Sequence, residues 1–395
     1  MARAVAFLLT PLIARLYTPE DFAVFAIITS VIGPLAVFCT GRYQLAIFLP
    51  QDERDANGLI NLSLYLSLTF SFLTLVILFF FYHHIGNILN LDELSYLLFA
   101  VPISLFSLAV SQVYTCYYNR IMRYKLISLG IIIQASATVF IQLLFGYYGF
   151  NKSGLVYGYV LGNLLAGIYF IYFGPSLISK MTDLVNLAKQ YKKYPMVSTW
   201  SALLDSMALQ IPIWLMTKNY SAEFLGAFSF SFKVINVPLG IISGSIAQIL
   251  HKKVADNYRE KSHRTIDVLN KFLLMLTIIS IPIIFICIIW GEELFSFVFG
   301  KKWAYAGKLS SILIIAFVIR FIVSPLTSVL ALDRHLKKGA AWQVLYFIST
   351  SITLYFASQF EFQMFIKIFV FHEIILYLIY LSLVYYSAFK DRSNA

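Results

Sequence analysis

Charge is the scarcest property of this 395-residue chain, because Asp, Glu, Lys and Arg together make up only 12% of it. A soluble domain has charged side chains at about a quarter of its positions, so this composition excludes an ordinary soluble protein. Hydrophobic residues make up 60% of the chain, and the mean hydropathy is +0.79. A chain of this kind belongs in a lipid bilayer.

Motifs of nucleotide, cofactor and hydrolytic chemistry are also absent. The sequence has no Walker A motif, no glycine-rich dinucleotide fingerprint, no HExxH and no GxSxG. Its three cysteines, Cys39, Cys116 and Cys287, lie far apart in apolar stretches, which indicates neither a disulfide framework nor a set of metal ligands. We therefore expect no cofactor, no metal and no enzyme activity. The formal charge of +11 does not predict nucleic-acid binding, because in a membrane protein Lys and Arg mark the loops on one side.

Apolar runs of roughly 20 residues recur along nearly the whole chain, and each is long enough as a helix to cross about 30 Å of hydrocarbon. Helices satisfy their own backbone groups in lipid, and the period-two alternation of a membrane β-barrel is missing from runs such as Leu73–Phe81. The sequence therefore predicts an all-α polytopic membrane protein with about twelve helices and a truncated first helix. The expected spans lie near 4–16, 22–48, 59–81, 97–117, 126–145, 155–173, 196–216, 224–250, 269–289, 309–332, 340–356 and 364–389.

Lys and Arg are distributed unevenly among the connections between these runs. One alternate set of connections is basic and includes 119–125, 179–193 and 251–264, whereas the other set is poor in charge. Short basic loops stay in the cytoplasm, so this distribution predicts the orientation of the chain. With an even number of spans, both termini are expected in the cytoplasm.

A short phrase occurs twice at the edge of an apolar run: Tyr17–Phe25 reads YTPEDFAVF, and Tyr220–Phe228 reads YSAEFLGAF. Each copy would close the first hairpin of a six-helix half, which predicts a parallel repeat about an axis along the membrane normal. We expect an N-terminal lobe at 1–175, a cytoplasmic linker at 176–195 and a C-terminal lobe at 196–395. The acidic PED of the first copy is interpreted as a turn and helix N-cap rather than a site.

Three long stretches carry a family resemblance. They are the opening hairpin PLIARLYTPEDFAVFAIITSV with GRYQLAIFLP, the run Gly226–Asp256, and the run Phe299–Arg334. These stretches resemble the first two, the eighth and the tenth helices of the Wzx-type oligosaccharide flippases, which belong to the multidrug/oligosaccharidyl-lipid/polysaccharide exporter superfamily. The chain departs from that pattern in its short N-terminus and in Lys233, where an arginine is commoner.

The resemblance implies export of an oligosaccharide linked to undecaprenyl diphosphate, which is a polyprenyl lipid carrier. The direction of export is from the cytoplasmic to the periplasmic leaflet of a bacterial inner membrane. It implies alternating access between two lobes, a role in lipopolysaccharide O-antigen or capsular polysaccharide synthesis, and membrane lipid, polymerase and chain-length proteins as partners. A cation-coupled drug exporter and a lipid II flippase are alternatives within the superfamily. A membrane O-antigen polymerase or ligase is disfavoured, because the outward connections are short and carry no acid–base constellation.

Cations inside the apolar runs are the candidate substrate-binding residues, because a charge at membrane depth costs several kcal/mol and usually faces a cavity or a partner. Arg42, Lys233 and Arg320 are predicted to bind the diphosphate, the arginines by bidentate hydrogen bonds and the lysine as a point charge. Arg42 lies late in its expected span, so the alternative for this residue is that it reaches the membrane interface.

Acidic and titratable residues in the runs are the candidates for ion coupling or charge pairing. Asp205 either couples an ion or pairs with one of the cations. His372 and Glu373 are adjacent and could carry protons, or Glu373 could pair with Lys367 nearby.

Overall fold

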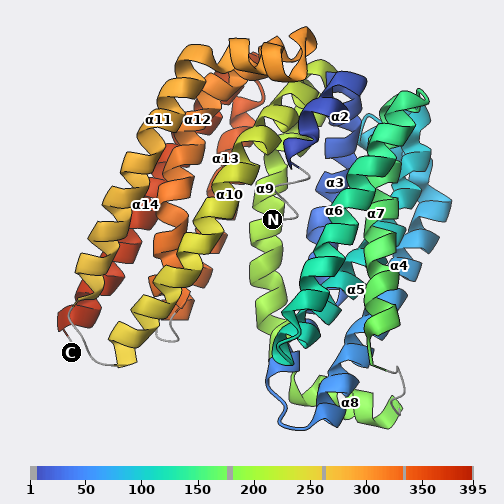
Figure 1. The fold of residues 1–395 in the computed structure, drawn as a ribbon, viewed down its shortest axis with the longest axis vertical. Coiled ribbons are helices and arrows are strands. Elements are labelled where there is room, and N and C mark those ends of the chain that lie inside the picture. Colours follow the sequence, from blue (N-terminus) through green and yellow to red (C-terminus); the bar gives the residue numbers. More distant parts are fainter. Residues whose placement is uncertain (1–6, 176–180, 260–263, 332–334, 394–395) are drawn as a thin grey trace. The chain divides into compact units, whose positions relative to one another are not determined.

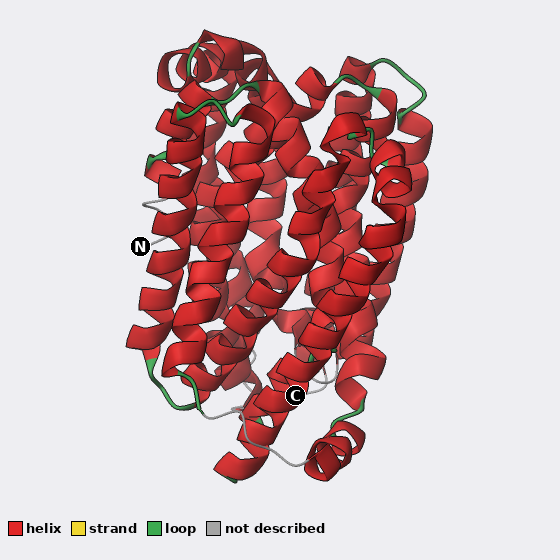
Figure 2. Ribbon diagram, turned by 90° about the vertical axis from the view of Figure 1, so that its right-hand side faces the viewer, coloured by secondary structure: helices red, strands yellow, loops and turns green. Residues whose placement is uncertain are grey.

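The computed structural model describes residues 7–175, 181–259, 264–331 and 335–393. Every regular element within these ranges is a helix, and they contain no strand (Figure 2). Ten of the described helical segments are long and apolar enough to cross a membrane. The predicted all-α polytopic membrane fold is therefore confirmed, whereas the count of twelve spans stays a prediction. The helices are α2 (Thr10–Leu16), α3 (Pro19–Cys39), α4 (Glu53–Ile88), α5 (Ala100–Arg120), α6 (Tyr124–Tyr147), α7 (Asn151–Phe173), α8 (Met181–Gln190), α9 (Thr199–Asn219), α10 (Ala222–Arg259), α11 (Thr265–Phe299), α12 (Ala304–Leu326), α13 (Leu336–Ala357) and α14 (Phe362–Ser393), with short helical turns η1 (Tyr43–Phe48), η2 (Asp92–Phe99), η3 (Tyr194–Ser198), η4 (Lys301–Trp303) and η5 (Thr327–Ala331).

The chain divides into two compact units, Met1–Gly226 and Ala227–Ala395 (Figure 1). The predicted linker, 176–195, falls within the first unit, and its residues 176–180 lie outside the described residues. Residues 4–6 of the first expected span also lie outside them. The division into lobes at 1–175 and 196–395 stays a prediction.

The first copy of the repeated phrase begins α3 with a capping box. The Thr18 backbone N–H donates to the Asp21 carboxylate at 2.8 Å, and the Asp21 backbone N–H donates to the Thr18 hydroxyl oxygen at 3.4 Å. Pro19 occupies the first helical position, where its missing N–H costs nothing. The interpretation of PED as a helix start is confirmed.

The expected span 22–48 is wrong at its C-terminal end, because α3 stops at Cys39. Gly41 and Arg42 both adopt left-handed backbone angles, with φ of 55° and 60°. Consecutive residues in this region cannot continue a right-handed helix. Arg42 therefore lies in a turn between α3 and η1, not late in a membrane span.

α6 and α7 form a closely packed hairpin within the first unit. Glycines recur every fourth residue along α7 at Gly154, Gly158 and Gly162. A Cβ at Gly162 would overlap Thr138 of α6, and one at Gly158 would overlap Gln142. Small residues at this spacing let two membrane helices approach closely and replace the missing hydrophobic driving force with van der Waals contact.

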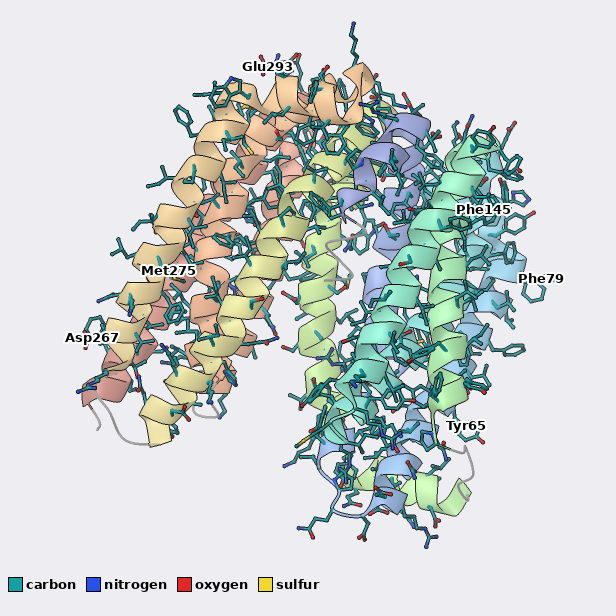
Figure 3. All side chains as sticks on the ribbon, viewed as in Figure 1. Tyr65, Phe79, Phe145, Asp267, Met275 and Glu293 are labelled. Carbon is teal, nitrogen blue, oxygen red and sulfur yellow. The ribbon has the colours of Figure 1, made fainter. Side chains whose placement is uncertain are left out.

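Two long helices expose large apolar faces. On α4, Phe79 is 69% exposed and points away from the first unit (Figure 3), and Tyr65 is exposed on the same helix. On α11, Met275 and many Ile and Phe side chains are exposed in the second unit. Apolar faces of this length are expected where helices meet lipid rather than water.

An aromatic cluster fills part of the second unit. Trp303, which follows α11, is fully buried and lies with its ring centroid 3.9 Å from that of Phe230 on α10. Phe295 and Phe299 of α11 pack edge-on against the same Phe230 ring. These contacts join α10 to the end of α11 and the start of α12.

Candidate functional site

A buried carboxylate lies among three helices of the second unit. Glu373 on α14 is only 3% exposed, and its Oε1 accepts a hydrogen bond of 2.8 Å from the Tyr346 hydroxyl on α13. An ionised carboxylate inside a membrane helix bundle is costly unless a donor and a cation offset its charge. We call the group formed by Arg320, Tyr346, Ser349, His372, Glu373 and Tyr377 the Glu373 cluster.

Arg320 of α12 supplies the cation of this cluster. Its charge acts electrostatically on Glu373, and its guanidinium carbon lies 5.9 Å from the centroid of the Tyr377 ring. A guanidinium at that distance over an aromatic face gains a cation–π attraction. Lys367, the alternative partner for Glu373, is exposed instead. The structure thus brings Arg320 and Glu373 together, a pairing that no sequence pattern predicted.

His372 joins the cluster through a second contact between α13 and α14. Its Nε2 and the Ser349 hydroxyl oxygen lie 3.1 Å apart. Its Nδ1 is 3.9 Å from Glu373 Oε1, which is too long for a hydrogen bond. His372 and Glu373 therefore lie side by side in one buried site, and each contacts a hydroxyl of α13.

Stacked rings lie next to this site. Trp342 of α13 stacks on Tyr380 of α14, with ring centroids 4.3 Å apart and an angle of 5° between the rings. Tyr346 and Tyr377 lie edge to face at 6.3 Å. These large side chains exclude water, and a low local dielectric strengthens the interaction between Arg320 and Glu373.

Lys233 lies half-buried on α10. The adjacent Phe232 packs edge-on against Phe317 of α12, with ring centroids 4.9 Å apart. Phe317 precedes Arg320 by about one helical turn. Lys233 and Arg320 are thus carried by two helices that are in contact.

Arg42 and Asp205 belong to the first unit. The Arg42 Nε atom is buried and has no hydrogen-bond partner among the described residues. Burial lowers the pKa of the Arg42 guanidinium, and Cys116 of α5 lies nearby. Arginine nevertheless stays cationic in proteins. Asp205 lies exposed on α9.

Of the six predicted site residues, Arg320, His372 and Glu373 are brought together in the Glu373 cluster.

Tyr346, Ser349 and Tyr377 are members of the cluster that sequence reasoning missed. The chain has 26 tyrosines, and no motif marks the two that lie near Glu373. A partial signal existed, because a buried carboxylate requires donors from neighbouring helices.

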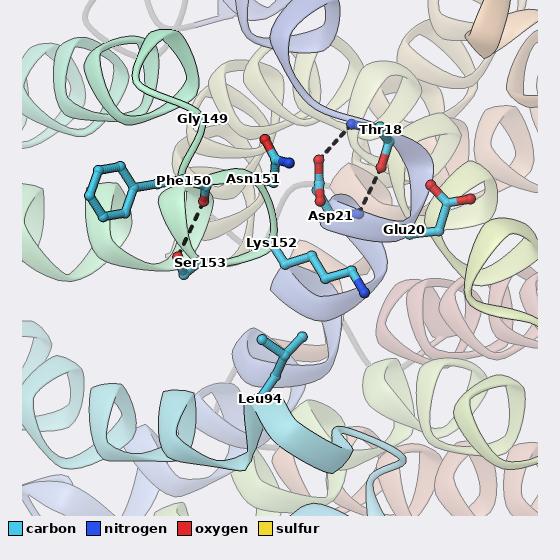
Figure 4. A pocket seen from close by; sticks show the side chains of 9 residues that line it. All are labelled: Thr18, Glu20, Asp21, Leu94, Gly149, Phe150, Asn151, Lys152 and Ser153. Atoms are coloured by element: carbon cyan, nitrogen blue, oxygen red, sulfur yellow. Dashed lines mark hydrogen bonds between the residues drawn. The ribbon is translucent and has the colours of Figure 1, made fainter.

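A pocket of about 570 Å³ opens in the first unit at the starts of α3 and α7 (Figure 4). Its lining includes Glu20 and Asp21 at the start of α3, Leu94 of η2, and Asn151 and Lys152 at the start of α7. The described residues contain no group of His, Cys, Asp and Glu that could hold a metal ion.

The fold is similar to that of solved proteins of the MOP superfamily. A solved lipid II flippase MurJ in an inward closed conformation matches with a TM-score of 0.80 and 12% sequence identity, covering 100% of this chain and 88% of that one. An inward-facing multidrug resistance MATE family transporter matches with a TM-score of 0.77 and 11% identity, covering 99% of this chain and 96% of that one. At such low identity these similarities establish the fold alone.

The chain belongs to the polysaccharide biosynthesis protein family, which matches residues 12–308. A putative O-antigen transporter of Shigella flexneri is 21% identical over 340 residues, 82% of this chain and 79% of that protein. The capsular polysaccharide biosynthesis protein CapF of Staphylococcus aureus is 24% identical over 338 residues, 83% of this chain and 82% of CapF. The teichuronic acid biosynthesis protein TuaB of Bacillus subtilis strain 168 is 27% identical over 160 residues, 40% of this chain and 32% of TuaB. The family, its relatives and the membrane-spanning helices together point to a multi-pass membrane transporter.

Proposed function

We propose that this protein carries a polyprenyl-diphosphate-linked oligosaccharide from the inner to the outer leaflet of a bacterial cytoplasmic membrane by alternating access. Membership of the polysaccharide biosynthesis family supports the substrate class. A fold shared with a lipid II flippase supports the mode of transport. Relatives named as an O-antigen transporter and a capsular polysaccharide protein support a role in surface polysaccharide synthesis.

The observation that carries this proposal is the charge-compensated Arg320 in the Glu373 cluster. A lipid diphosphate is an anion that must cross a low-dielectric region, so its carrier needs cations at membrane depth. Arg320 is half-buried, so one side of its guanidinium can face the substrate while Glu373 and Tyr377 hold the other. Arg320 and Lys233 contact the diphosphate in this proposal, and Glu373 compensates the charge of Arg320 when no substrate is bound.

The remaining predicted residues take the following roles. Arg42 contacts the diphosphate at the cytoplasmic end of the first unit through the accessible part of its half-buried side chain. His372 and Asp205 act in ion coupling or charge pairing. Each pairs with the substrate or with another charged group, and the partner differs between conformations of the transporter.

The proposed setting follows from the loop charges. Both termini and the basic connections face the cytoplasm. The two six-helix lobes rock against each other during transport. Polymerase and chain-length proteins then receive the exported unit. Undecaprenyl diphosphate is the proposed lipid carrier.

Deletion of the gene tests the proposal. We expect loss of surface polysaccharide together with accumulation of the lipid-linked repeat unit on the cytoplasmic side, and restoration of both by the wild-type gene. Lys233→Ala at equal membrane abundance should fail to restore export. Accumulation of lipid II would favour the peptidoglycan precursor as substrate instead, and drug sensitivity with normal polysaccharide would favour a drug exporter.

A further inference from the structure

The short helix α8 (Met181–Gln190) packs on the end of the first unit at which α4 begins (Figure 1). Its Leu184 and Leu187 are buried in a core cluster that also contains Tyr43, Leu59 and Tyr114. Leu187 lies directly over Gly58 of α4, where any side chain would overlap its methyl group. The connection between α7 and α9 therefore contains a docked element rather than a loose tether.

The exposed edge of α8 carries a second contact. Arg54 of α4 and Asp183 of α8 form an ion pair of 2.9 Å between nitrogen and oxygen. An exposed pair of this kind stabilises by at most about 1 kcal/mol. The ion pair adds a contact at the edge of α8, whereas the buried leucines provide the packing against the first unit.

One hydrogen bond links α8 to the turn that carries Arg42. The Tyr43 hydroxyl donates to the Ala188 backbone carbonyl of α8 at 3.0 Å. Tyr43 is buried and follows Arg42 directly, so its ring and hydroxyl fix one end of the turn Gly41–Tyr43, which we call the Arg42 turn.

The Arg42 turn adopts a conformation that needs such support. A non-glycine residue with φ of 60° is disfavoured and persists only where the surroundings determine it. The same conformation places the Arg42 Nε in a buried position with no hydrogen-bond partner among the described residues. The turn thus holds a half-buried cation at a defined place.

We propose that α8 is a positioning element, which acts through Tyr43 to hold Arg42 in its substrate-binding geometry. The positioning itself depends on contacts within the first unit, and its effect on transport rests on the function proposed above. Tyr43 is a positioning residue because it acts through Arg42 and not on the substrate.

Cysteine labelling tests the docking directly, in a background that lacks Cys39, Cys116 and Cys287. Leu187→Cys, at a position 5% exposed, should react slowly with a membrane-permeant maleimide, whereas Val185→Cys, at a position 44% exposed, should react fast. Adding Tyr43→Phe should raise the labelling rate of Leu187→Cys several-fold, the size expected for one hydrogen bond. Tyr114→Phe is the matched control, because its buried hydroxyl in the same core cluster has no hydrogen-bond partner among the described residues. Equal labelling with Tyr43→Phe and Tyr114→Phe would overturn the proposal.

Export measurements test whether the positioning acts through Arg42. We expect Tyr43→Phe to reduce export several-fold at equal abundance, and to cause no further loss when Arg42→Ala is already present. Additive losses would overturn the proposal, because Tyr43 would then act independently of Arg42. If labelling responds to Tyr43→Phe but Arg42→Ala exports normally, the docking of α8 stands and the proposed role of Arg42 in transport is wrong.

Discussion

The opposite charges of Arg320 and Glu373 offset each other. A double variant can therefore separate the effect of Arg320 on stability from its effect on transport. Arg320→Ala alone leaves a buried carboxylate without its cation, and we expect a loss of about 3 kcal/mol and a lower membrane abundance. Adding Glu373→Gln should restore abundance, because the amide carries no charge, but should not restore export. Immunoblots of membrane fractions and surface polysaccharide assays measure the two effects. Normal export by the double variant would show that Arg320 does not contact the substrate.

Tyr346 should contribute to the stability of the same site. Tyr346→Phe removes the hydroxyl that donates to Glu373, and a hydrogen bond to a charged group is worth about 1.5–3 kcal/mol. Thermal unfolding of the purified protein in detergent should therefore begin at a lower temperature. Thr350→Val on the same helix is the control, because the buried Thr350 hydroxyl has no hydrogen-bond partner among the described residues. Equal unfolding temperatures for the two variants would mean that Glu373 is satisfied without Tyr346.

At the scale of residues, the charged side chains inside the apolar runs could be located from the sequence, but the residues that they contact could not. Arg320, His372 and Glu373 stand out because each interrupts an apolar run, and the structure brings all three into one site. Tyr346 carries no such signal, since a tyrosine in a membrane helix is ordinary. Which side chain meets Glu373 depends on how α13 and α14 pack, and that is a property of helix pairing rather than of either segment.

At the scale of helices, the hairpin of α6 and α7 depends on the glycines of α7. Gly162→Leu places a side chain where Thr138 already lies, so the helices must separate and the packed surface is lost. We expect a fall in thermal stability of several degrees and reduced abundance. Gly244→Ala on α10 is the comparison, because nothing lies within 4 Å of its added methyl group, and alanine favours the helix by roughly 1 kcal/mol. Similar behaviour of both variants would contradict close packing at Gly162.

Helix positions were predictable wherever an apolar run ends in polar residues. The expected span 126–145 corresponds to α6, and the acidic start of α3 was recognised from its capping residues. The end of α3 was not recognised, because apolar residues resume at Leu45 and the expected span was continued across the polar stretch from Thr40 to Gln44. The left-handed backbone at Gly41 and Arg42 stops the helix within that stretch. The docking of α8 was equally hidden, since its two buried leucines gain a partner only in the folded unit.

At the scale of the whole molecule, the orientation in the membrane is the central prediction. Single cysteines introduced in the connections 179–193 and 251–264 should react with impermeant maleimide only after the cytoplasmic side is made accessible. The same reagent should label Lys152→Cys in intact cells whose outer envelope layers have been permeabilised. Labelling of either basic connection from outside would show that the proposed orientation in the membrane is wrong.

The length of α4 has a practical consequence. Its 36 residues extend for about 54 Å, whereas the hydrocarbon of a bilayer is only about 30 Å thick. The polar end with Glu53 and Arg54, beside which α8 lies, therefore projects into water as a stiff, folded epitope. An antibody fragment that recognises this epitope would add a rigid landmark to the particle and would aid its alignment in electron microscopy.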